Sequence, residues 1–326
     1  MKRTYVVIFL LLSILGFYLS NKPNSSTAII PTVAFISLTD VDNQTFNEFK
    51  EKMKQYGWDE TKNIKYIVSK PAQVPENLPS LVASIIKQNP TLILVSSTPA
   101  TKEVKKATEI NNIPVVFCPV NDPIASNIVA NLKAPEKNIT GVRLASGDVK
   151  RFEWLHLIAP TVKNIILPYT YKDKGSIAAR EEIKVIASAL GLTIIEKELL
   201  NSSDINQYMS QLPNKIDAIF LPRDSGIETK IDDFVAYANR HKLPLCVPSS
   251  QQVYKGGLFT YGFIHTELGK DGAKMVDRIL QGVQPTDIPV KTADSYLVIN
   301  KKTAQKIGLV FPSQAIQNAY LTIEDE

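Results

Sequence analysis

The sequence predicts an α/β protein made of two similar doubly wound lobes, each built on a parallel sheet. Short apolar runs such as 92–95 have the length and composition of strands that are buried on both faces. Helical patterns alternate with these runs along the chain, which is typical of parallel α/β sheets. One pattern also occurs twice: the strand and polar turn at 92–98 precede a helix and the strand 113–118, and those at 218–224 precede a helix and the strand 243–247.

Each element of the first half has a local signature. Residues 31–36 form an apolar run, and Phe46, Phe49 and Met53 then recur at helical spacing before Gly57 closes the helix. The remaining elements of this half follow the same alternation and are predicted as the strand 64–68, helix 78–88, strand 92–95, helix 100–111, strand 115–118 and helix 124–132.

The second half repeats the alternation, with Gly191 as one helix end. Its elements are predicted as the helix 149–158, strand 164–167, helix 177–190, strand 192–195, helix 205–212, strand 216–221, helix 227–240 and strand 243–247. Beyond Val247 the order changes, and we expect the strand 256–262, helix 268–281, connector 285–289, strand 296–299 and helix 301–307.

Composition excludes several classes of function. The 326 residues suffice for two domains, and the 37 basic and 32 acidic residues are interspersed, so no stripe for nucleic acid is expected. Three His and two Cys are too sparse for a His/Cys metal site. The sequence has no nucleophile elbow, P-loop or dinucleotide fingerprint, so we expect neither an enzyme nor a cofactor.

The amino terminus has the pattern of an export signal. Lys2 and Arg3 precede the segment 5–19, which is apolar apart from Ser13, and a polar linker follows. We assign residues 1–28 to a signal peptide or to an uncleaved membrane anchor with its linker, and the pattern leaves both open. Either one places the protein in the periplasm or at the outer face of the cytoplasmic membrane.

Polar residues follow the predicted strands, at the edge where open parallel sheets bind ligands. Ser97 and Thr98 precede a helix whose bare N–H groups suit a carboxylate, although ordinary helix capping alone also explains them. Asp224, in the matching turn of the other lobe, suits an ammonium group. Asp122 either meets the ammonium or caps the helix predicted after Pro123.

Four further residues are candidates for binding. Tyr169 either stacks on an aromatic ring or lies on a loop surface. Arg223 either forks onto a carboxylate or phosphate, or forms a surface ion pair. Ser250 and Gln251 follow the last core strand and are weaker candidates of the same kind.

The order and spacing of short motifs resemble one bacterial family, the solute-binding components of ABC importers of the tryptophan/aromatic amino-acid type. The resemblance covers about residues 32–312. The motifs that carry it are Thr98-Pro99-Ala100, Ile113-Pro114-Val115, Asp122-Pro123, Thr140-Gly141-Val142, Asp217-Ala218-Ile219, Gly256-Gly257-Leu258, Glu267-Leu268-Gly269, Leu280-Gln281-Gly282-Val283-Gln284-Pro285 and Val298-Ile299-Asn300-Lys301-Lys302-Thr303-Ala304.

The resemblance implies the fold of a type I periplasmic binding protein, in which three crossings form the hinge. The first lobe would comprise 29–145 with 265–289, and the second 146–264 with 290–326. The resemblance further implies that Thr39 and Asp40 face the cleft between the lobes. We expect the crossings near 143–148, 262–265 and 288–292, and the helix 267–282 packed on the first lobe.

The resemblance also implies a function. It predicts an extracytoplasmic solute-binding protein that closes over an amino acid, preferably aromatic, or a similar small carboxylate, and that acts as a monomer with ABC permease subunits. A membrane-tethered sensor that uses the same cleft is the alternative. The chain departs from the family pattern in two ways. It has no lipobox Cys, and Arg143 and Arg223 stand where small or polar residues are common. If both arginines line the cleft, they favour a more acidic ligand.

Overall fold

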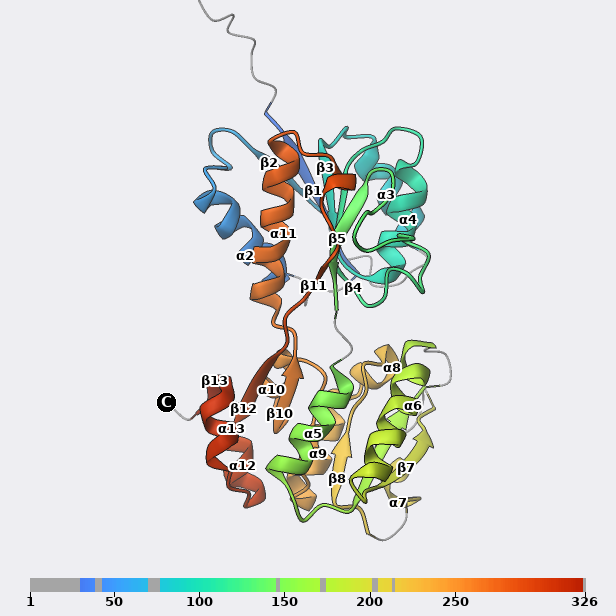
Figure 1. Cartoon of the computed structure of the whole chain (residues 1–326), viewed down its shortest axis with the longest axis vertical. Helices are drawn as coiled ribbons and strands as arrows, with labels where there is room; N and C mark the ends of the chain where they lie inside the picture. Colours follow the sequence, from blue (N-terminus) through green and yellow to red (C-terminus); the bar gives the residue numbers. More distant parts are fainter. Residues whose placement is uncertain are drawn as a thin grey trace, which may run out of the picture.

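The computed structural model describes residues 30–38, 43–69, 77–144, 147–170, 174–200, 205–212 and 215–324. Two lobes lie one beyond the other along the long axis of the molecule (Figure 1). Within the described residues the strands form two separate, largely parallel sheets, which confirms the predicted fold class. The predicted signal or anchor at 1–28 and the candidates Thr39 and Asp40 lie outside the described residues.

The first sheet is parallel throughout. Its order is β11-β5-β4-β3-β1-β2. The bounds of its strands are β1 Thr32–Ile36, β2 Lys65–Val68, β3 Leu92–Val95, β4 Val115–Val120, β5 Ile139–Arg143 and β11 Lys291–Thr292.

Helices cover both faces of this sheet because its strands are apolar on both sides. Val33 and Phe35 of β1 pack into the core beneath α2 (Asn43–Gln55) and α11 (His265–Leu280). Ala34 and Ile36, on the opposite face, pack beneath α3 (Leu78–Ile86) and α4 (Thr98–Thr108). The helix α11, although late in the chain, lies beside α2 on the first lobe (Figure 1).

The second sheet has the order β13-β12-β10-β9-β8-β6-β7, and its pairs are parallel except β10 with β12. Its strands are β6 Asn164–Tyr169, β7 Thr193–Glu198, β8 Ala218–Phe220, β9 Leu245–Cys246, β10 Phe259–Gly262, β12 Tyr296–Asn300 and β13 Ala319–Ile323. The accompanying helices are α5 Asp148–Ile158, α6 Lys174–Ala189, α7 Ile205–Ser210, α8 Ser225–Glu228, α9 Ile231–His241, α10 Ser250–Tyr254, α12 Lys301–Ile307 and α13 Ser313–Asn318, and the 3-10 helix η3 (Pro285–Asp287) lies on the first lobe.

The chain passes between the lobes after β5, after β10 and after β11. The strand β11 pairs with Val142 and Arg143 in the first sheet. The third crossing therefore comes after Thr292, a few residues later than the predicted boundary between 289 and 290, because Lys291 and Thr292 still belong to the first lobe.

Two predicted helices differ from the structure. The helix expected at 124–132 is wrong: these residues form turns, and Asn127 has a left-handed φ of 57° that interrupts any helix. The helix expected at 227–240 is two helices, α8 and α9, separated by Thr229 and Lys230. In both places local hydrogen bonds prevail over apolar spacing.

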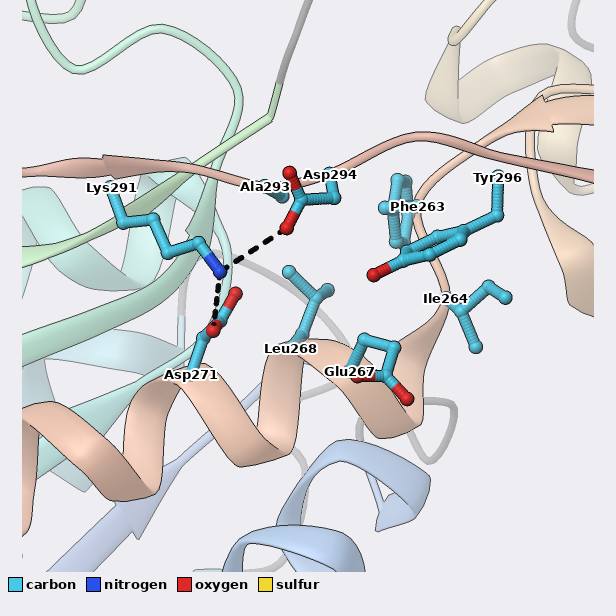
Figure 2. Close-up of a pocket in the computed structure, with 9 residues that line it drawn as sticks. All are labelled: Phe263, Ile264, Glu267, Leu268, Asp271, Lys291, Ala293, Asp294 and Tyr296. Atoms are coloured by element: carbon cyan, nitrogen blue, oxygen red, sulfur yellow. Dashed lines mark hydrogen bonds and ion pairs between the residues drawn. The ribbon is translucent and has the colours of Figure 1, made fainter. Parts of the chain in front are cut away.

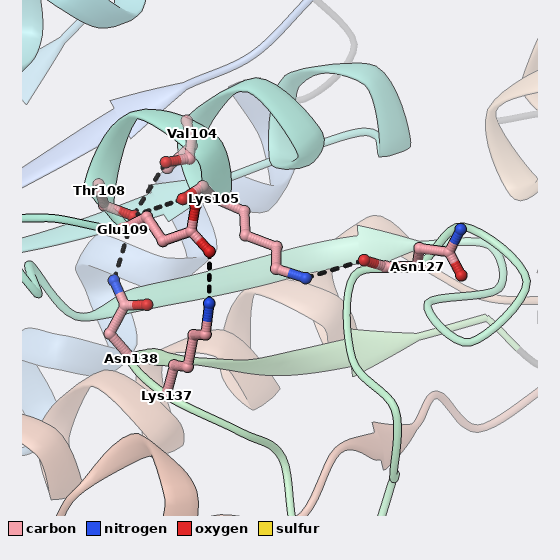
Figure 3. A network of polar contacts seen from close by, with 7 residues as sticks. All are labelled: Val104, Lys105, Thr108, Glu109, Asn127, Lys137 and Asn138. Carbon is pink, nitrogen blue, oxygen red and sulfur yellow. Dashed lines mark hydrogen bonds and ion pairs between the residues drawn. The ribbon is translucent and has the colours of Figure 1, made fainter.

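A polar network fixes the carboxyl end of α4 and so helps to orient the helix whose other end carries Ser97 (Figure 3). Lys105 Nζ donates to the carbonyl oxygen of Asn127 at 2.8 Å. Lys137 forms an ion pair with Glu109, the residue that ends α4. Through these contacts the turns before β5 hold α4 in place.

Candidate functional site

The carboxyl ends of the parallel strands in both lobes face the hinge. In the first lobe, β5 is parallel to its neighbours and runs straight into the first crossing. In the second lobe, β10 is parallel to β9 and runs into the second crossing. The loops that follow β1, β3 and β4 are therefore directed toward those that follow β6, β8 and β9. This is the edge at which open parallel sheets bind ligands.

Ser97 and Thr98 lie at the amino end of α4, as the sequence predicts. Ser97, rather than the Thr98 that directly precedes Pro99, is the cap: its Oγ accepts a hydrogen bond from the N–H of Ala100 at 3.4 Å. Its φ of 80° is strained for a residue with a side chain. The Ser97 N–H donates to the carbonyl oxygen of Pro119 at 3.1 Å, which ties the β3 loop to β4. Ser97 and Thr98 are both partly exposed, so a ligand can reach them.

Asp122 follows β4 and is exposed. Its Oδ1 accepts hydrogen bonds from the N–H groups of Ile124 and Ala125 at 2.9 and 3.0 Å. The carboxylate therefore caps a turn, because the helix that the sequence predicts after Pro123 is not formed. Oδ2 of the same carboxylate has no part in these two bonds.

Asp224 is the most constrained of the candidates. Its side chain is 3 % exposed. Oδ2 accepts a hydrogen bond from the N–H of Thr170 at 2.8 Å, and Oδ1 accepts one from the Thr170 hydroxyl at 2.7 Å and one from the N–H of Ile227 at 3.2 Å. The carboxylate thereby joins the loop after β6 to the loop after β8 at the carboxyl end of the second sheet.

Tyr169 ends β6 and is half-buried. The guanidinium of Arg180 lies over its ring, with Cζ 3.8 Å from the ring centroid. This cation occupies one face of the ring. A ligand ring can therefore meet Tyr169 only at its other face or at its edge.

Arg223 lies where the second lobe meets the hinge. Its Cζ is 5.7 Å from the centroid of Phe263 in the second crossing, and its Nη2 lies 3.3 Å from the position that a Cβ on Gly147 would occupy. Burial lowers the pKa of Arg223; Arg151 lowers it further, and Asp148 acts in the opposite direction. The side chain is nevertheless partly exposed, so a cleft ligand can meet it.

Of the three other candidates, Arg143 and Gln251 touch the hinge or the opposite lobe, and Ser250 is buried. Arg143 Nε donates to the hydroxyl of Thr292 at 2.9 Å, which links β5 to β11. Ser250 is buried, with 4 % of its surface exposed. Gln251 Nε2 donates to Oε1 of Gln44 at 3.1 Å, so a side chain of α10 contacts α2 across the lobes.

Sequence reasoning missed a buried ion pair beneath this edge. Arg151 is 1 % exposed, its Nη2 donates to Asp148 Oδ1 at 2.8 Å, and its Cζ lies 4.2 Å from the centroid of Phe220. The two charged residues are three apart at the start of α5, a spacing that allows such a pair. Thr170 was also missed, because a single hydroxyl after Tyr169 gives no signal until its partner Asp224 is known.

A separate cavity lies at the hinge and is not the ligand site. Its volume is about 30 Å³, enough for a water molecule and far too small for an amino acid. Its walls come from the second and third crossings and from α11 (Figure 2). Within the described part of the chain, no group of three His, Cys, Asp or Glu side chains could hold a metal ion.

Comparison with known sequences identifies the family. The family described as "ABC transporter substrate binding protein" matches residues 30–323. A curated relative, the tyrosine-binding protein of Clostridioides difficile, is 25 % identical over 262 residues, which cover 80 % of this chain and 75 % of the relative. The described residues contain no helix with the length and apolar character needed to span a membrane.

Solved structures agree with this assignment. An ABC domain from Streptococcus pneumoniae in complex with L-Trp is 25 % identical, with a TM-score of 0.77, and the match covers 90 % of this chain and 98 % of that one. A ligand-free, open substrate-binding protein with adhesive properties from Clostridium difficile is 26 % identical, with a TM-score of 0.74 and coverages of 90 % and 99 %.

The fold and the opposed strand-end loops thus define a two-lobed binding protein of the type I periplasmic class. The chain belongs to the ABC transporter substrate-binding protein family. Members of this family are extracytoplasmic substrate-binding proteins rather than enzymes.

Proposed function

We propose that this protein is the binding component of an ABC importer, that it closes its lobes over an aromatic amino acid such as tyrosine or tryptophan, and that it delivers the ligand to membrane permease subunits as a monomer. One observation carries the proposal: Ser97 and Thr98 of the first lobe and Asp224 of the second lobe each follow a strand whose carboxyl end is directed toward the hinge. The ligands named for the two similar proteins support the choice of amino acid.

The polar groups suit the two ends of an amino acid. The amino end of α4 offers N–H groups and a hydroxyl for the carboxylate. The Asp224 carboxylate offers the counter-charge for the ammonium group, and its bonds to Thr170 hold it in one orientation before the ligand arrives. Tyr169 and Arg223 lie in or beside the same loops, where they border the ligand's side chain.

Asp224→Asn tests the proposal. Asparagine has the same shape and keeps one oxygen acceptor for the Thr170 hydroxyl and the Ile227 N–H, but its NH2 group then faces the Thr170 N–H, so circular dichroism checks that the variant folds. The substitution removes the charge that pairs with the ammonium. We expect calorimetry with L-tyrosine and L-tryptophan to show affinity reduced by at least about 30-fold. Asp232→Asn is the matched control, because Asp232 lies in the same lobe with a side chain that is 77 % exposed. Equal affinity of wild type and Asp224→Asn would refute the role of Asp224.

Export is proposed on the sequence pattern at 1–28. Mass spectrometry of the mature chain, purified from the membrane and from the soluble extracytoplasmic fraction, separates the two forms. A mass that lacks the apolar segment 5–19 indicates a cleaved signal, and a full-length mass in the membrane fraction indicates an anchor.

A further inference from the structure

The second lobe extends past the hinge on the side away from the candidate site. In its sheet the second and third crossings join β10 and β12, whereas the candidate-site loops follow β6, β8 and β9. The strand β13 pairs with the other side of β12. In Figure 1, β13 and α8 accordingly lie on opposite sides of the crossings. The crossings are thus a pivot between the cleft and β13.

Among the described residues, a hydrogen bond joins the lobes on this far side. The hydroxyl of Tyr320, in β13, donates to Oε1 of Glu267, in the first turn of α11, at 3.2 Å. Lys270 Nζ contacts the same oxygen at 2.7 Å, which holds the carboxylate in place. The Tyr296 ring packs on the Tyr320 ring, with centroids 4.4 Å apart. The charge of Glu267 raises the pKa of Tyr320, so the phenol remains a donor at neutral pH.

The surrounding structure leaves room for this contact to move. Lys291 Nζ lies 2.6 Å from Asp271 and 3.3 Å from Asp294, so one end of the third crossing is anchored to α11. Toward Tyr296 and Glu267 the hinge cavity separates the crossing from α11 (Figure 2). Densely packed interiors resist displacement, and the cavity leaves fewer packed contacts between the crossing and α11 here.

We infer that the Tyr320–Glu267 hydrogen bond is a clasp that opposes closure of the cleft. The inference rests on the proposed function, in which the lobes close on a ligand. A rotation about the crossings that brings the loops after β6, β8 and β9 toward the first lobe carries β13 away from α11 and breaks this bond. Apparent affinity falls as the closed state becomes less populated. Tyr320 is therefore a positioning residue that weakens ligand binding without touching the ligand.

Tyr320→Phe tests the clasp, because phenylalanine keeps the ring that packs on Tyr296 and removes only the hydroxyl. We expect calorimetry to show that Tyr320→Phe binds its ligand, either L-tyrosine or L-tryptophan, about two- to fivefold more tightly than wild type does. Tyr254→Phe, at a residue of α10 that is 61 % exposed, should leave affinity unchanged. Affinity that is equal to or weaker than wild type in Tyr320→Phe would overturn the inference.

A ligand-free measurement tests the clasp separately from the proposed function. Spin labels at Lys106→Cys in α4 and Glu181→Cys in α6 report the distance between the lobes, since the native Cys118 and Cys246 are buried. Adding Tyr320→Ala should enlarge the population at short distance, and an unchanged distribution contradicts the clasp. If wild type binds neither amino acid, the proposed ligand fails, and the distance distribution still decides the clasp.

Discussion

His265 shows how one buried side chain ties the hinge to the first lobe. It begins α11 and is 6 % exposed; its Nδ1 lies 3.1 Å from the Thr45 hydroxyl of α2, and its ring meets Phe263 edge-on at 5.2 Å. Burial lowers its pKa to about 4. The amino end of a helix also disfavours a cation, so the ring is neutral at physiological pH.

This burial predicts a loss of stability in acid. Because the folded-state pKa of about 4 lies below the ordinary 6.5, the unfolded chain binds more protons between these values. The stabilisation from neutral His265 is fully present above about pH 6.5 and is lost as the pH falls toward 4. The free energy of unfolding should decrease by up to about 3 kcal/mol over this range. Denaturant unfolding of wild type and His265→Gln across this range measures it. His241→Gln, at an exposed residue, is the control, and parallel curves for wild type and His265→Gln would disprove the assignment.

At the scale of elements, the close contact of α11 with α2 depends on Gly269, which has no side chain. A Cβ on Gly269 would lie 2.3 Å from the carbonyl oxygen of Thr45 and 2.9 Å from the backbone nitrogen of Phe49. The helices approach so closely because residue 269 is glycine. This contact attaches a late helix to the first lobe and so sets the direction of the second crossing.

Gly269→Ala should therefore force α11 away from α2 and lower the free energy of unfolding by about 1–3 kcal/mol. Gly272→Ala is the matched control in the same helix, since its Cβ would lie 3.4 Å from Cys118 Sγ and no closer to any other atom. That variant should be neutral or slightly stabilising, because alanine favours helix. Thermal or denaturant unfolding compares the two, and a Gly269→Ala variant as stable as Gly272→Ala would count against this packing.

Sequence patterns predicted the elements whose apolar periodicity agrees with their local hydrogen bonding. The buried strands and the capped start of α4 are such elements, and the alternation of strands and helices was sufficient for the fold class. The pattern failed at 124–132, where the Asp122 carboxylate and the left-handed Asn127 favour turns over a helix. It also missed α13, which is short and mostly exposed, and β13, which is short and mostly half-buried.

The candidate site was less predictable than the fold. Strand ends can be placed from sequence, so the loops that carry Ser97 and Asp224 were found. The partners of these residues depend on distances between loops of different strands. Thr170, which is 54 residues from Asp224, and the contact between Gln44 and Gln251, 207 residues apart, are of this kind. No local pattern encodes such pairs.

At the scale of the whole molecule, separate cores make rigid-body closure the expected response to a ligand. Each lobe has its own sheet, with apolar clusters on both faces. The three crossings and a few polar contacts join the lobes in the described part of the chain. Because packed cores do not deform gradually, motion concentrates at the crossings.

Small-angle X-ray scattering should therefore detect a smaller radius of gyration when L-tyrosine or L-tryptophan saturates the wild-type protein. Ligand at about 100 times its Kd should also add about 2.7 kcal/mol to the unfolding free energy, because it binds the folded state alone. Asp224→Asn at the same ligand concentration should show both changes reduced, with a stabilisation of about 0.9 kcal/mol or less, since it loses the ammonium partner and at least about 30-fold in affinity. A clear heat of binding with an unchanged radius would mean that the ligand binds without closure. The clasp at Tyr320 would then have nothing to oppose, because its effect on affinity requires β13 to leave α11 when the cleft shuts.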